Sequence, residues 1–115
     1  MFNLDDVVDT ELAGDALEEV VMGLIINAGQ ARSLACTALK QAKAGDFSGA
    51  QRTMEQSRMA LSEAHRVQTQ LIENDQGEGK IKVSLVLVHA QDHLMTAMLA
   101  RELIAELIAL HEKVQ

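Results

Sequence analysis

Four side chains that can form hydrogen bonds lie close together in an otherwise apolar segment. They are His89, Gln91, Asp92 and His93, within residues 86–95. A buried polar group without a partner costs roughly 1–3 kcal/mol. The cluster therefore indicates either a satisfied polar network or a site with a chemical task.

Two of these residues, His89 and His93, are four positions apart and would share one face of a helix. Such a pair can bind zinc, but a zinc site needs three or four protein ligands. His65 and His111 lie on other turns, which disfavours zinc. A second interpretation is a pair of satisfied core histidines that fixes the register of the helix.

A third interpretation uses one histidine as a nucleophile, because a neutral imidazole nitrogen can accept a phosphoryl group. Such a carrier needs a positioned nitrogen, donors for the phosphoryl oxygens and little access for water. His89 would be the nucleophile, with Gln91 and His93 as donors. We expect Gln91 to point to a different side of the helix, where it more easily serves an adjacent chain. The residues alone leave these interpretations open.

The composition predicts an all-α protein. The chain has 115 residues, enough for one domain, and 48% of them are apolar. It contains no proline, tryptophan or tyrosine and only two phenylalanines, which disfavours a β-sandwich or barrel. Strong helix formers such as alanine, leucine and glutamate dominate instead.

The net charge of −7 comes from the N-terminal part of the chain. Seven acidic residues precede the first base, Arg32, and the remaining acidic and basic residues balance. Without a basic patch or aromatic platform, nucleic-acid binding is disfavoured. No apolar run is long enough to span a membrane. The acidic N-terminus does not resemble a secretory signal, so we expect a cytoplasmic protein. Cys36, the only cysteine, reads as a small buried apolar residue.

The apolar periodicity predicts three helices after an acidic, flexible tail at residues 1–14 that ends at the helix-breaking Gly14. The expected helices cover residues 15–44, 46–73 and 80–114. Gly45 is a good left-handed stop and Asp46 a good N-cap, so the first two helices should form an antiparallel hairpin.

The third expected helix is apolar on nearly every side from Val83 to Leu99. Its main repeat, here called the long stripe and expected to face the core, consists of Ile81, Leu85, Val88, Asp92, Met95, Leu99, Leu103, Leu107, Leu110 and Val114. A second repeat, the short stripe, consists of Val83, Leu87, Ala90, Leu94 and Met98. One bundle buries about one face of each helix. The excess of apolar surface therefore predicts a homo-oligomer with this helix at its centre.

Several stretches resemble one known family. They are residues 17–33, residues 77–102 and, within the latter, the segment His-Ala-Gln-Asp-His-Leu-Met that begins at His89. They are similar to the lactose/cellobiose-type IIA component of the bacterial phosphoenolpyruvate-dependent sugar phosphotransferase system, and most to its N,N'-diacetylchitobiose/cellobiose branch. The resemblance covers essentially all of the chain after the acidic tail.

This resemblance implies an antiparallel three-helix IIA domain over residues 15–115, assembled into a homotrimer with the third helix near the axis. It implies a cytoplasmic phosphocarrier that accepts phosphate on His89, at Nε2, from the histidine-containing phosphocarrier protein. The phosphate then passes to a cysteine of the cognate IIB component, for uptake of N,N'-diacetylchitobiose or cellobiose through the membrane IIC component. The IIA component itself does not contact sugar.

The resemblance also implies that Asp92 lies at the trimer axis and helps to hold a divalent metal. Three converging carboxylates repel one another unless they are protonated or bridged by a cation. An oxygen-preferring ion such as Mg²⁺ suits this arrangement better than zinc. The alternative function is a non-enzymatic helical oligomeric adaptor, in which the polar cluster only sets register.

Overall fold

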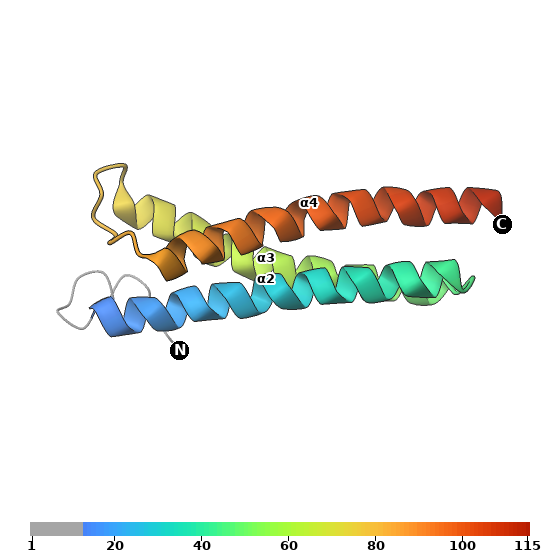
Figure 1. Cartoon of the computed structure of the whole chain (residues 1–115), viewed down its shortest axis with the longest axis horizontal. Coiled ribbons are helices and arrows are strands. Elements are labelled where there is room, and N and C mark those ends of the chain that lie inside the picture. The colour runs from blue at the N-terminus through green and yellow to red at the C-terminus, as the bar shows by residue number, and fades with distance from the viewer. Residues whose placement is uncertain (1–12) are drawn as a thin grey trace.

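The computed structural model describes residues 13–115, which form three long helices and their connections, with no strand in that range. The helices are α2 (Ala13–Lys43), α3 (Phe47–Asp75) and α4 (Leu85–Val114). They lie along one another in an elongated bundle of 57 × 25 × 19 Å. Figure 1 shows that α3 runs antiparallel to both α2 and α4. The predicted all-helical three-helix bundle is confirmed. Within residues 13–115, none of the helices combines the length and the hydropathy of a membrane span.

The short α2–α3 connection has the predicted geometry. Gly45 has a φ of 86°, which a residue without Cβ adopts at little cost. The Asp46 carboxylate accepts a hydrogen bond of 2.9 Å from the backbone N–H of Gly49 and caps α3. These local signals require no distant contact, so the sequence predicts the hairpin correctly.

The start of α2 differs from the prediction. The helix already includes Ala13 and Gly14, so Gly14 does not break it. A single glycine costs a helix only about 1 kcal/mol. The rest of the expected tail, residues 1–12, lies outside the described residues.

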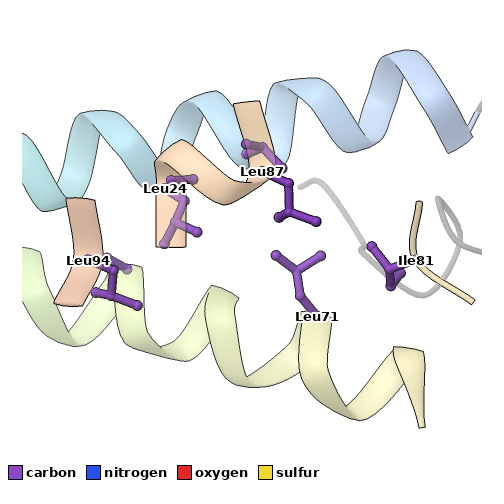
Figure 2. Close-up of a cluster of buried hydrophobic side chains, with 8 residues drawn as sticks. Leu24, Leu71, Ile81, Leu87 and Leu94 are labelled. Carbon is purple, nitrogen blue, oxygen red and sulfur yellow. The ribbon is translucent and has the colours of Figure 1, made fainter. Parts of the chain in front are cut away.

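The core consists of two clusters of buried side chains. One part, shown in Figure 2, contains Leu24 from α2, Leu71 from α3, and Leu87 and Leu94 from α4, with Ile81 from the loop before α4. The other part contains Ile104 and Ile108 of α4 packed on buried alanines. Those alanines are Ala35, Ala38, Ala42 and Ala50. Their small side chains let neighbouring helices approach closely, while each buried leucine contributes about 1.5–3 kcal/mol.

The third helix begins at Leu85, five residues later than the predicted start at residue 80. Its N-cap is Ser84, whose hydroxyl accepts a hydrogen bond of 3.2 Å from the backbone N–H of Leu87. A serine just before an apolar run is a recognised start signal, and the sequence reading missed it. The later start places His89 near the N-terminal end of α4 rather than deep inside the helix.

The loop over residues 76–84 is held in a non-helical shape by the carboxylate of Asp75. Its oxygens accept backbone N–H hydrogen bonds from Ile81 at 2.9 Å and from Gly79 at 3.3 Å. Gln76, Gly77 and Gly79 have positive φ values. Ile81 therefore reaches the core from the loop and not from a helix. Its apolar side chain fitted the helical repeat in the sequence only because it is buried.

We expect Asp75→Asn to lower the melting temperature by a few degrees at neutral pH. The hydrogen bond from the Ile81 backbone, aided by that from Gly79, lowers the pKa of the Asp75 carboxyl in the folded state. Its stabilisation is therefore present above the ordinary carboxyl pKa and is lost as the pH falls through the lower folded-state pKa. Thermal unfolding measured by circular dichroism over a pH series should show the two proteins converging in acid. A constant difference at all pH values would contradict this assignment.

The two apolar stripes of α4 differ in burial, and the short stripe is the one that packs inside the chain. In the short stripe, Leu87, Ala90 and Leu94 are buried, and Ala97, Ile104 and Ile108 extend this buried face. From Leu85 onward, the long stripe is exposed, and its apolar members keep between 42% and 87% of their surface accessible. Placing Asp92 on a core stripe was therefore wrong for the single chain.

A polar contact joins all three helices near the middle of the bundle. Ser57 of α3 donates a hydrogen bond of 2.6 Å to the carbonyl oxygen of Ala31 in α2. Its hydroxyl accepts a hydrogen bond of 3.0 Å from Arg101 Nε in α4. Arg101 Nη2 also donates to the carbonyl oxygen of Met54 at 3.1 Å. These bonds satisfy the buried hydroxyl and fix α4 against α3.

Candidate functional site

The structure brings His89 and His93 together on one side of α4. Their ring centroids are 4.8 Å apart, with an edge-to-face angle of 80° between the rings. His89 is exposed and His93 is half-buried. Within residues 13–115, no hydrogen bond joins either ring to another residue. The core-histidine interpretation is therefore wrong for His89 in the single chain, and its ring is open to an incoming group.

The position of His89 near the start of α4 favours an anion on its ring. His89 is on the second turn, and helical side chains lean toward the helix N-terminus, over the first turn. The first-turn N–H groups give this end a partial positive charge, and that turn contains no acidic residue to neutralise it. A phosphoryl group on His89 would gain about 0.3–1 kcal/mol from this end of the helix.

Gln91 does not join the two histidines within one chain. Its side-chain oxygen accepts a hydrogen bond from Gln68 Nε2, across the α3–α4 contact. Gln91 also lines a cavity of about 260 Å³ between the end of α3, the following loop and the start of α4. The expectation that Gln91 points to a different side of α4 agrees with this placement.

Asp92 lies on the exposed long stripe, between Val88 and Met95. Among residues 13–115, no group of three or more histidine, cysteine or acidic side chains is arranged to hold a metal ion. A single carboxylate per chain does not satisfy the six oxygen ligands that Mg²⁺ prefers. A metal site at Asp92 would therefore need further oxygen ligands, from water or from another chain.

Two further findings concern residues outside the polar cluster of α4. Cys36 is exposed on α2, so its assignment as a buried apolar residue was wrong. The sequence analysis missed Gln68, a buried residue of α3 that is the partner of Gln91. The available signal was a long polar side chain at a core position, where an apolar residue is the ordinary choice.

The three-helix fold and the histidine pair on α4 fit a small phosphotransferase component. The sequence model described as the lactose/cellobiose-specific IIA subunit of the phosphotransferase system matches residues 19–112. The chain belongs to this family, which confirms the resemblance found in the sequence.

The similar relatives include the N,N'-diacetylchitobiose-specific EIIA component of Escherichia coli strain K12. It is 72% identical over 115 residues, which cover 100% of this chain and 99% of the relative. A lichenan-specific phosphotransferase enzyme IIA component of Bacillus subtilis is 40% identical over 87% of this chain and 91% of its own length. Among solved structures, the Escherichia coli IIA(Chitobiose)–HPr complex matches with a TM-score of 0.76 and 78% identity. The match covers 85% of this chain and 95% of that chain.

Proposed function

We propose that the chain carries a phosphoryl group on His89 between two proteins of a sugar phosphotransferase system. The donor is the histidine-containing phosphocarrier protein (HPr), and the acceptor is a cysteine of the cognate IIB component. The observation that carries the proposal is an exposed, unbonded histidine on α4 beside His93, in a chain of this family. The solved complex of a 78% identical relative with HPr supports the donor.

The transfer needs little chemistry from the protein. The neutral His89 Nε2 attacks phosphorus as the donor's N–P bond breaks, and the donor imidazole leaves with the electron pair of that bond. The same displacement then moves the group from His89 to a thiolate sulfur. The chain contributes an accessible nitrogen, a positive helix end and the N–H donors of His93 and Gln91. Gln91 would serve the His89 of an adjacent chain.

We propose a homotrimer in which the long stripe of three α4 helices packs around a common axis. The exposed apolar members of this stripe support the assembly, because patches of this extent are usually covered by another chain. His89 follows Val88, and His93 follows Asp92, so both rings stand at the edge of the stripe. They would then lie in the crevice between subunits, where a docked partner can exclude water.

On this axis, three Asp92 carboxylates would converge in an apolar environment. We propose that Mg²⁺ or a similar divalent ion is held there by these carboxylates and water. The ion would neutralise the charge of the axis and would not take part in the transfer at His89.

The Asp92→Leu variant tests whether the Asp92 carboxylates lie together at the trimer axis. Removing three like charges from an apolar interface should keep the trimer intact. The free energy of dissociation should stay the same or rise by about 1–4 kcal/mol, so that the trimer resists dilution better. Native mass spectrometry should also show the loss of bound divalent ion relative to the wild-type chain. Dissociation of the variant into monomers would contradict this expectation and indicate that bridging contacts to the cation dominate.

The pathway we propose is the uptake of N,N'-diacetylchitobiose or cellobiose, as the name of the 72% identical relative suggests. In this role the chain works in the cytoplasm and meets the IIB component, without direct contact with sugar, nucleic acid or the membrane interior. The alternative of a non-enzymatic adaptor has no observation in its favour beyond the oligomer-forming surface.

Incubation with phosphoenolpyruvate and the general phosphotransferase proteins tests the proposal. Intact mass spectrometry should show one added phosphoryl group of about 80 Da per chain. Adding the cognate IIB component should discharge this group. A chain that stays unmodified under conditions that charge the donor would instead support the adaptor.

A further inference from the structure

The side chain of Gln68 is a costly choice for its position in the core. Only 7% of the residue is exposed, and it shares the core face of α3 with Ala64 and Leu71. Within the described residues, its side-chain oxygen has no hydrogen-bond partner. An unpaired buried amide oxygen costs roughly 1–3 kcal/mol, so an apolar residue of the same size would be more stable here.

The other half of the Gln68 amide has a defined partner. Its Nε2 donates to the side-chain oxygen of Gln91. This bond fixes which end of the Gln91 amide faces α3, because a glutamine oxygen accepts while its nitrogen only donates. The two N–H groups of Gln91 Nε2 are left over, and no residue in the 13–115 range accepts them.

We propose that Gln68 is a positioning residue that holds the Gln91 amide with its nitrogen available to a phosphoryl oxygen. This inference rests on the proposed function. Gln91 and His89 lie on different faces of the same helix, so the phosphoryl group that Gln91 meets is on His89 of an adjacent chain. Without Gln68, the Gln91 amide is free to turn and loses its preorganised donor.

The Gln68→Leu variant removes the amide and keeps the volume of the side chain. At saturating HPr, the rate of His89 phosphorylation should fall about tenfold, as expected for one hydrogen bond to a charged group. The KM for HPr should stay unchanged, and the melting temperature should stay equal or rise. A purely structural role would lower the melting temperature and leave the rate intact, which would overturn the proposal.

Two further variants keep the test independent of core packing. Gln91→Glu retains an acceptor for Gln68 but has no N–H and adds a negative charge that repels the phosphoryl oxygens, so its loss of rate should be at least as large. Gln70→Ala, on α3 but outside the core face, should behave like the wild type. Equal rates for Gln91→Glu and the wild type would overturn the proposal even if Gln68→Leu does not fold.

Mixed trimers decide whether Gln68 acts on the adjacent chain. Chains carrying Gln68→Leu are refolded at equal ratio with chains carrying His89→Ala, so that only the former accept phosphate. About half of the intact His89 sites then face a neighbour with intact Gln68 and Gln91, and this half should recover the wild-type rate. A single slow phase would overturn the proposal.

The wild-type chain in the same series separates this inference from the proposed function. If the wild type is phosphorylated while Gln68→Leu reacts at the same rate, the role of Gln68 is overturned and the carrier function stands. A wild type that takes no phosphate overturns both.

Discussion

The His89→Ala variant is expected to accept no phosphate while keeping its fold. His89 is exposed and unbonded near the positive end of α4 and is the nucleophile that we propose, and alanine leaves no atom able to form an N–P bond. Because the ring makes no hydrogen bond in the described part of the chain, its removal should cost little stability. Intact mass spectrometry after charging with phosphoenolpyruvate should show complete loss of the added mass, with an unchanged circular dichroism spectrum.

The matched control for this variant is His65→Ala. His65 is also exposed, but it lies on α3, outside the histidine pair. This variant should accept phosphate to the wild-type level. Phosphate on the His89→Ala chain, or its loss from the His65→Ala chain, would show that the acceptor has been wrongly assigned.

Replacing Leu99 and Leu103 together with glutamate is expected to convert the proposed trimer into folded monomers. These side chains are 55% and 56% exposed in the single chain, so the substitutions should leave the protomer core intact. In the trimer each leucine would contribute about 1.5–3 kcal/mol by burial, and six carboxylates would instead face one another. Light scattering coupled to size-exclusion chromatography should report the mass of one chain, with helical content retained.

The control for the double substitution in the long stripe is Met59→Glu. Met59 is 61% exposed, but it lies on α3 rather than on the long stripe. This variant should remain trimeric. If the double glutamate variant has the same mass as the wild type, the long stripe is not the interface between chains.

The double variant also connects assembly to function. In monomers His89 would lose the neighbouring chain and the Gln91 that we place beside it. Phosphorylation should then be slower than in the trimer, yet still detectable, because the nucleophile itself remains. His89→Ala should remove labelling whether the chains are assembled or not.

Local signals in the sequence determined the helical class, the α2–α3 hairpin and the pairing of two histidines. The alanines from Ala28 to Ala42 that recur every three or four residues in α2 are buried, as helical geometry requires, and Gly45 with Asp46 forms the turn. His89 and His93 meet because residues four apart share a helix face. Each of these features depends on the geometry of a single helix or a single turn.

Tertiary contacts decided the burial of the two apolar stripes of α4 and the partner of Gln91. The start of α4 follows from two local signals that the sequence analysis missed: the Ser84 N-cap, and the Asp75 carboxylate that binds the backbone of Ile81, six residues away. Both stripes are apolar, so only packing against α2 and α3 selects the buried one. The bond between Gln68 and Gln91 joins residues 23 apart on different helices. Helical periodicity specifies neighbours along one helix, whereas the rotation and register of one helix against another follow from the combined packing of all three.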